Sequence, residues 1–178
     1  ERNIPSPADE LIIRAGAQRD AGDLTGAMAT LGEASRLDPA NEAIRVEAAD
    51  ILLEQGQAEE AQALLNSLSP LTRMEDRAAQ LIAKAGFALG GQSAGDESAL
   101  RATLADHPDD HETRLQLANL LVARGRFAEG MDELLAIVQS DRAWNDDAAR
   151  KSLLSVFSML GADPLVMQYR RKLASALN

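Results

Sequence analysis

The sequence predicts an all-α fold, a right-handed solenoid of about four helix hairpins followed by two C-terminal helices. Three glycine-centred segments recur between helix-like stretches: Ala21-Gly22-Asp23-Leu24, Glu54-Gln55-Gly56-Gln57 and Ala123-Arg124-Gly125-Arg126. Gly22 and Gly56 are 34 residues apart, and Gly91 divides the 69 residues between Gly56 and Gly125 into 35 and 34. A 34-residue period with a central glycine is typical of stacked helix hairpins, which present an extended surface to other proteins.

The composition is that of a folded helical chain. Of the 178 residues, 46% are apolar but only 3% are aromatic, which favours close packing of small and aliphatic side chains. Without cysteine there are no disulfides, thiolate metal sites or thiol chemistry. No apolar stretch is long enough for a membrane span, and no signal-peptide pattern is present. Because the chain starts at Glu1 without methionine, we expect a fragment or a processed form.

The charge is unevenly distributed. The net charge of −10 argues against nucleic-acid binding, which needs a basic surface. Residues 1–147 carry 13 basic and 27 acidic side chains, whereas residues 148–178 carry five basic and one acidic. A basic C-terminal segment on an acidic body could dock within the chain or reach for an acidic partner.

Aligning the glycines at position 15 gives four units, 8–41, 42–75, 77–110 and 111–144. Position 8 is small, with Ala15, Ala49 and Ala118, and position 20 is small, with Ala27, Ala61 and Gly130. Position 24 is leucine in all four units: Leu31, Leu65, Leu100 and Leu134. This pattern resembles the tetratricopeptide repeat. The third unit is degenerate, because Lys84 and Asp96 replace small residues and Gly90–Gly95 widens its turn.

Start and stop signals place the helix ends. Ser6 and Pro7 predict a capped first helix, and Thr72 predicts a capping box that opens unit three. Pro39 ends the second helix of unit one, and Pro108 ends the second helix of unit three. Pro70 shortens the second helix of unit two.

Residues 145–178 form a predicted C-terminal cap or docking segment. Asn145 caps a helix that ends at Gly161, and a last helix runs from Leu165 to about Leu177. Leu165, Tyr169, Leu173 and Leu177 form an apolar stripe, with Arg170, Arg171 and Lys172 mainly off it. The stripe could cover the last repeat, or the helix could dock onto a partner. The two roles are compatible if the apolar stripe covers the repeat and the basic face of the helix binds the partner.

The first helix of each unit lines the concave side of such a solenoid and carries an apolar strip. The predicted client-binding groove consists of Ile12, Val46, Leu53, Leu81, Leu115 and Val122. A contiguous exposed apolar strip usually marks a binding site. The alternative is that another element or a second copy in a homodimer covers it.

Several specific chemistries are not supported. Some repeat proteins of this type clamp a C-terminal carboxylate with Lys, Asn and Arg. Those positions hold Ile12, Gly16, Glu47, Ala78 and Ile82 here, so no cation is present for a carboxylate.

Metal and catalytic sites are likewise not supported. His107 and His111 are separated by Pro108, which disfavours a shared helical zinc site. The acidic pairs Glu59-Glu60 and Glu75-Asp76 are typical of solvated helix starts. The 90–95 glycine cluster lacks the Lys–Ser/Thr of a phosphate loop. The sequence therefore predicts no enzyme, no metal and no cofactor.

The tail after Trp144 carries the most specific resemblance. Asp147-Ala148-Ala149-Arg150-Lys151-x-Leu153-Leu154-x-Val156-Phe157-x-x-Leu160-Gly161 precedes Asp163-Pro164-Leu165 and Tyr169-Arg170-Arg171-x-Leu173-Ala174. This resembles the C-terminal signature of the bacterial co-chaperedoxins (YbbN/CnoX-like proteins), in which a thioredoxin-like domain precedes a tetratricopeptide repeat region.

The resemblance implies a function. It implies a cytoplasmic protein that holds unfolded clients and hands them to the chaperonin and the Hsp70-type chaperone. It also implies that residues 165–177 contact the chaperonin and that the native protein has an N-terminal thioredoxin-like domain, absent here. The alternative is a generic repeat scaffold that organises an unrelated complex.

Overall fold

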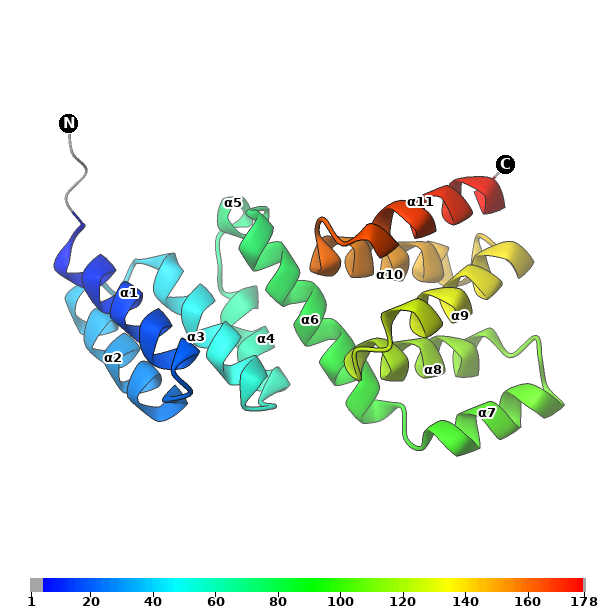
Figure 1. Ribbon diagram of the computed structural model, residues 1–178, viewed down its shortest axis with the longest axis horizontal. Coiled ribbons are helices and arrows are strands. Elements are labelled where there is room, and N and C mark those ends of the chain that lie inside the picture. Colours follow the sequence, from blue (N-terminus) through cyan, green and yellow to red (C-terminus); the bar gives the residue numbers. More distant parts are fainter. Residues whose placement is uncertain (1–4, 178) are drawn as a thin grey trace. The chain divides into compact units, whose positions relative to one another are not determined.

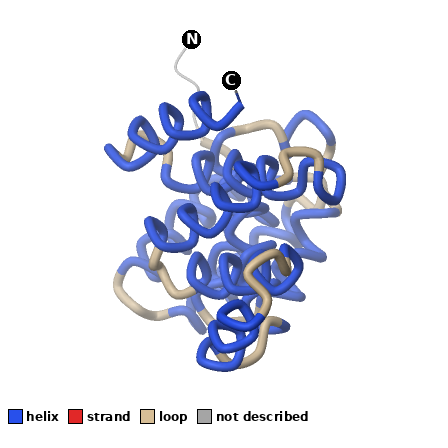
Figure 2. The backbone as a smooth tube through the Cα atoms, turned by 90° about the vertical axis from the view of Figure 1, so that its right-hand side faces the viewer, coloured by secondary structure: helices blue, strands red, loops and turns tan. Residues whose placement is uncertain are grey.

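The chain is helical throughout the part that the structure describes. A computed structural model describes residues 5–177, which contain eleven α-helices and no strand (Figures 1 and 2). They form two compact units that divide between Ala85 and Gly86. The all-α repeat fold predicted from the sequence is therefore confirmed, and the two units are described separately.

The N-terminal unit contains two long hairpins, one short helix and the first half of a long helix. Its helices are α1 (Pro7–Asp20), α2 (Leu24–Leu37), α3 (Glu42–Glu54), α4 (Ala58–Asn66), α5 (Pro70–Arg73) and α6 (Asp76–Ser93), of which α6 continues past the division. The C-terminal unit adds α7 (Glu97–Asp106), α8 (His111–Ala123), α9 (Phe127–Ser140), α10 (Trp144–Leu160) and α11 (Pro164–Leu177). Residues of α10 and α11 pack in the core of this second unit.

Three of the four expected turn glycines are confirmed. Gly22, Gly56 and Gly125 have φ values of 84°, 77° and 76°, in the left-handed region that favours glycine. They separate α1 from α2, α3 from α4 and α8 from α9. Each of these glycines ends the first helix of a hairpin.

The predicted turn at Gly91 is wrong. Helix α6 continues to Ser93, and the left-handed residue is Gly95, with φ of 80°. Gly91 is buried inside the helix, where an added Cβ would lie 2.6 Å from the Cβ of Ala123. It is thus a packing glycine, which the 34-residue spacing could not distinguish from a turn glycine. Asp96 then caps α7 by accepting a hydrogen bond from the Ala99 amide.

The helix ends follow most of the local signals. Ser6 and Asp9 form a capping box, α2 and α7 end before Pro39 and Pro108, and Pro70 opens α5. The predicted capping role of Thr72 is wrong, because Ser69 caps α5 and Thr72 lies within that helix.

The start of α10 also differs from the prediction. Asn145, Asp146 and Asp147 all have positive φ, between 47° and 59°, and Asn145 makes no cap hydrogen bond. Right-handed helical geometry begins only after Asp147. Asn and Asp tolerate the left-handed region better than other non-glycine residues, which explains why this turn consists of them. The helix ends at Gly161 as expected.

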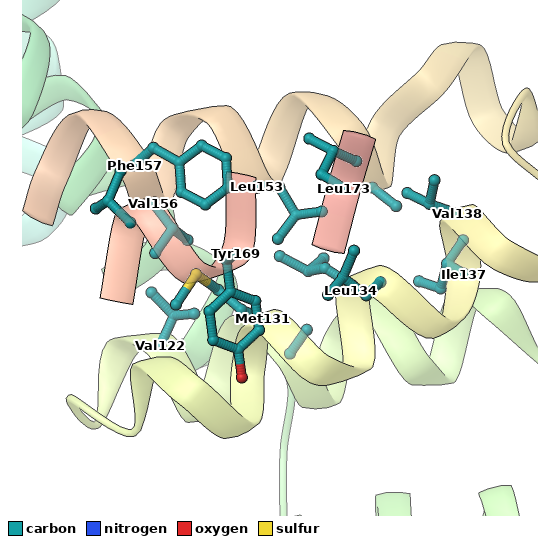
Figure 3. Close-up of a cluster of buried hydrophobic side chains, with 14 of the residues drawn as sticks. Val122, Met131, Leu134, Ile137, Val138, Leu153, Val156, Phe157, Tyr169 and Leu173 are labelled. Atoms are coloured by element: carbon teal, nitrogen blue, oxygen red, sulfur yellow. The ribbon is translucent and has the colours of Figure 1, made fainter. Parts of the chain in front are cut away.

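Small residues at the helix crossings let the hairpins pack closely. The predicted position 8 and position 20 alanines are completely buried (Ala15, Ala27, Ala49, Ala61, Ala118). At Gly130 an added Cβ would lie 2.6 Å from Cγ2 of Val122. The largest core lies in the C-terminal unit, where side chains from α8, α9, α10 and α11 converge (Figure 3).

Candidate functional site

The N-terminal unit contains a pocket of about 360 Å³. It is formed by α1, the start of α3, α5 and the start of α6. Its lining residues are Ile12, Asn41, Glu42, Ala43, Val46, Glu47, Thr72, Glu75, Arg77 and Ala78. The pocket therefore lies on the side of the hairpins where the sequence predicted a groove.

The floor of the pocket is apolar. Ile12 is half-buried and packs against the core of α1, α2 and α3. Val46 and Ala78 are buried in the adjoining core of α3, α4 and α6. A surface of this kind takes aliphatic parts of a partner, because contact removes apolar area from water on both sides.

Glu42 forms one wall of the pocket and is held in its ionised form. Its carboxylate accepts hydrogen bonds from the Ser69 amide (2.9 Å) and hydroxyl (2.8 Å), and it pairs with Arg45 at 3.0 Å. Hydrogen bonds from the Thr72 hydroxyl and from Ser69 lower the pKa of Glu42 from 4.5 to about 2. Glu42 thus contributes a fixed negative charge above that pH.

Glu47 is the most buried charged side chain of the pocket, with 4% of the side chain exposed. The Nη1 atom of Arg19 donates to Glu47 Oε1 at 2.9 Å and to Asp50 Oδ2 at 2.7 Å. Arg77 donates from the other side, to Glu47 Oε2 and to Asp50. Both oxygens of the buried carboxylate are therefore neutralised by arginines from α1 and α6.

These arginines lie outside the clamp positions considered in the sequence. The clamp positions of the repeat contain no cation, but Arg19 and Arg77 reach Glu47 from other positions. Both are already paired with carboxylates of α3. Glu47 stood out in the sequence only as a clamp position, and no local spacing relates it to Arg19 or Arg77.

The predicted groove residues do not form one exposed strip. Ile12 and Val46 line the pocket, while Leu53, Leu81, Leu115 and Val122 do not. Val46, Leu81 and Val122 are 8%, 5% and 2% exposed, so at these three positions the alternative applies, in which other parts of the chain cover the strip. Val46 and Leu81 pack in the core of α3, α4 and α6, and Val122 packs in the core of the C-terminal unit. Leu53 and Leu115 are half-buried against the same cores.

The stripe on the last helix faces inward. Tyr169 and Leu173 are buried, and Leu165 and Leu177 are half-buried, in the core formed with α9 and α10. The tyrosine hydroxyl is 2.8 Å from Asp132 Oδ1 and 2.9 Å from the Ala128 carbonyl oxygen. Figure 3 shows its ring beside Met131 and Val122. The helix therefore caps the last hairpin.

The basic residues of α11 remain on the surface. Arg170 lies 5.7 Å from the centre of the Phe157 ring, and Lys172 pairs with Asp132 at 3.1 Å. Arg171 has no carboxylate partner among residues 5–177. Exposed Met167 and Leu154 accompany these residues on α11 and α10.

The histidines do not join a cluster of metal ligands. His111 begins α8, and its ring stands edge-on to Trp144, with centres 5.7 Å apart. Residues 5–177 contain no group of three or more histidine and acidic side chains that could hold a metal ion. In the same range, no helix combines the length and the apolar character needed to cross a bilayer.

Stacked helix hairpins with glycine turns and small crossing residues define a helical repeat protein. Two family models, each described as tetratricopeptide repeat, match residues 18–85 and residues 90–178. The chain belongs to the tetratricopeptide repeat family. Members of such repeat classes serve as protein-protein interaction modules.

Several solved structures are similar to this chain. A domain of a protein of unknown function from Vibrio parahaemolyticus is 28% identical, with a TM-score of 0.42, over 93% of this chain and 97% of that one. A thermophilic tetratricopeptide repeat protein from Thermus thermophilus is 15% identical, with a TM-score of 0.47, over 96% and 98%. The tetratricopeptide repeat protein YrrB, which has an unusual peptide-binding site, is 14% identical, with a TM-score of 0.42, over 92% of each chain. The comparison with curated proteins finds no match.

Proposed function

We propose that this chain is the non-catalytic binding module of a cytoplasmic co-chaperone. In this role the pocket of the N-terminal unit holds an exposed segment of an unfolded client, and α11 recruits the chaperonin, with an Hsp70-type chaperone as a further recipient. The coarser function, a protein-protein interaction module, follows from the family. The finer role is supported by the pocket and by the resemblance of the tail to the co-chaperedoxins.

The observation that carries the client-binding part is the presence of exposed large apolar side chains on the segments that line the pocket. Ile13 on α1 is 66% exposed, and Leu71 on α5 and Met74 at the end of α5 are 77% and 80% exposed. Their sequence neighbours Ile12, Thr72 and Glu75 line the pocket itself. Exposed large apolar side chains on the segments that form a pocket are typical of a surface that binds other chains.

The recruitment part is supported by the outer surface of α10 and α11. Arg150, Arg170 and Arg171 are exposed and have no ion pair among residues 5–177. They lie on the unit whose last segment is basic, while the rest of the chain is acidic. Unpaired arginines beside exposed Met167 combine the charge and the apolar contact that a docking helix needs.

Client holding is tested by filling the pocket from its exposed rim. Ala43→Trp places a large ring at the pocket wall, and Ala29→Trp places the same ring on an exposed position of α2, away from the pocket. The measurement is light scattering of a thermally unfolding model enzyme with each variant. We expect wild type and A29W to suppress aggregation and A43W to lose most of that effect. Equal protection by A43W would overturn the client-binding part.

Recruitment is tested by charge reversal on the last helix. We expect the R170E/R171E variant to lose co-migration with purified chaperonin on a native gel. R14E/R36E reverses the same number of exposed arginines on α1 and α2 and should leave co-migration unchanged. If both double variants co-migrate like wild type, α11 is not the docking element and the generic scaffold is favoured.

A further inference from the structure

The pocket has an excess of negative charge that the client-binding proposal does not explain. Three carboxylates line it, those of Glu42, Glu47 and Glu75, against the single cation of Arg77. A pocket that served apolar segments alone would not gain from charged walls, because their desolvation costs free energy. The charges therefore bear on which segments the pocket selects.

The three carboxylates differ in their availability. Glu42 is occupied by Ser69 and Arg45, as described above, and Glu47 by Arg19 and Arg77. Glu75 is exposed, and its carboxylate has no ion pair or hydrogen bond among residues 5–177. The free acceptor at the pocket is thus Glu75.

Arg77 is the cation that an incoming positive charge would replace. Its side chain is 52% exposed, in contrast to 18% for Arg19, yet it reaches the buried carboxylate of Glu47. Because Arg19 holds the other oxygen of Glu47, Arg77 can leave without stranding that carboxylate alone. A long half-exposed side chain also gives up less packing when it moves than a buried one does.

The geometry points to a segment that combines aliphatic residues with a lysine or arginine as the preferred occupant. This inference rests on the proposed client binding and specifies its chemistry. The alkyl stem of the basic side chain packs on Ile12, Val46 and Ala78. Its cation is positioned by Glu75 and competes with Arg77 for Glu47. In the free protein, Arg77 occupies the place at Glu47 that the cation of the bound segment takes.

The test uses three labelled peptides and fluorescence anisotropy with the full chain. The first alternates leucine and lysine, the second has norleucine at each lysine, and the third has glutamate there. A favourable pair at a partly exposed site contributes about 1 kcal/mol, which is about a fivefold change in affinity. We therefore expect the lysine peptide to bind about fivefold tighter than the norleucine peptide, with the glutamate peptide weakest.

Three variants at exposed positions, one of them a control, sharpen the test. Glu75→Gln should remove most of the lysine preference, whereas Glu33→Gln on α2, outside the pocket, should keep it. Arg77→Gln should tighten the lysine peptide, since Glu47 then has a free oxygen. Circular dichroism checks that each variant is folded.

The possible outcomes separate the two proposals. Equal binding of the lysine and norleucine peptides to wild type would overturn the charge selection and leave client binding intact. Weaker lysine binding by R77Q would also overturn it, because Arg77 would then contact the partner directly. If A43W binds all three peptides as wild type does, the pocket is not the binding site and the proposed function itself fails.

Discussion

The hydroxyl of Tyr169 on α11 lies 2.8 Å from Oδ1 of Asp132 on α9. The same hydroxyl is 2.9 Å from the Ala128 carbonyl, and the tyrosine is 2% exposed. A buried polar contact of this kind fixes where the last helix lies on the last hairpin, because alternative positions would leave the hydroxyl without a partner.

We expect Tyr169→Phe to lower the free energy of unfolding by about 1 to 2 kcal/mol. The variant keeps the ring and removes the hydrogen bond, leaving Asp132 and the Ala128 carbonyl without that donor. Chemical denaturation gives the value. The control is the slope of the unfolding free energy against denaturant concentration, which should equal that of wild type. An unfolding free energy equal to that of wild type would contradict the role given to the hydroxyl.

The hydroxyl of Tyr169 should lose its proton only at a pH above the ordinary range for tyrosine. Burial, and then the hydrogen bond to Asp132, raise the pKa of Tyr169 above its ordinary value of 10. Because the folded pKa is above the unfolded one, this contribution to stability is complete below pH 10 and is lost as the pH rises through the folded pKa. The chain has one tyrosine, so absorbance at 295 nm reports it directly. Tyrosinate forming near pH 10 in the folded protein would contradict the prediction.

Glu42 should make the stability of the fold depend on pH in the acidic range. Its folded pKa of about 2 lies below the ordinary 4.5, so its contribution is complete above about pH 4.5 and is lost as the pH falls toward 2. We expect Glu42→Gln to lower the melting temperature at pH 7, and the gap to wild type to close across that range. Glu33→Gln, at an exposed position of α2, should show no such closing gap.

Two helical glycines should respond to alanine in opposite directions. Gly130→Ala should destabilise by about 1 to 3 kcal/mol, because its Cβ would meet Val122 and the Ala118 carbonyl. Gly32→Ala should stabilise by up to about 1 kcal/mol, because nothing lies within 4 Å and alanine is the better helix former. Thermal unfolding of both variants checks this, and a stabilised G130A would show that α8 and α9 do not cross so closely.

Arg19 allows a comparison of a buried and an exposed partner. Removing the buried charge with Glu47→Gln should cost about 2 to 3 kcal/mol, because Asp50 is then the one carboxylate that Arg19 and Arg77 still share. Asp20 pairs with the same arginine but is 72% exposed, so Asp20→Asn should cost less than about 0.5 kcal/mol. Denaturant titration measures both, and equal effects would contradict the burial argument.

The repeat architecture was predictable because its signals are local. A turn glycine, a small crossing residue and a proline after a helix each act within a few residues, as Gly22, Ala15 and Pro39 do. Gly91 and Gly95 show the limit: both are glycines in one stretch, and only the packing against Ala123 decides which is helical. The left-handed turn at Asn145 carries no spacing that distinguishes it from a helix cap.

The pocket was predictable only in part. Ile12 and Val46 lie at the repeat position that faces inward, and both line it. Val122, at another position expected to face inward, is buried in the core of the C-terminal unit. The charges of Arg19, Glu47 and Arg77 meet from three helices. Such a meeting depends on tertiary packing and leaves no periodic trace in the sequence.

Helix α6 contains three glycines, Gly86, Gly90 and Gly91, each of which weakens a helix by about 1 kcal/mol relative to alanine. Its first half is secured by Leu81 and Ala85 in one core, and its second half begins with Phe87 in another. With so little intrinsic helical preference after Ala85, the amide protons there are protected mainly by packing. We therefore expect amide hydrogen exchange to change rate partway along this helix, so that a single element reports separately on the opening of each unit.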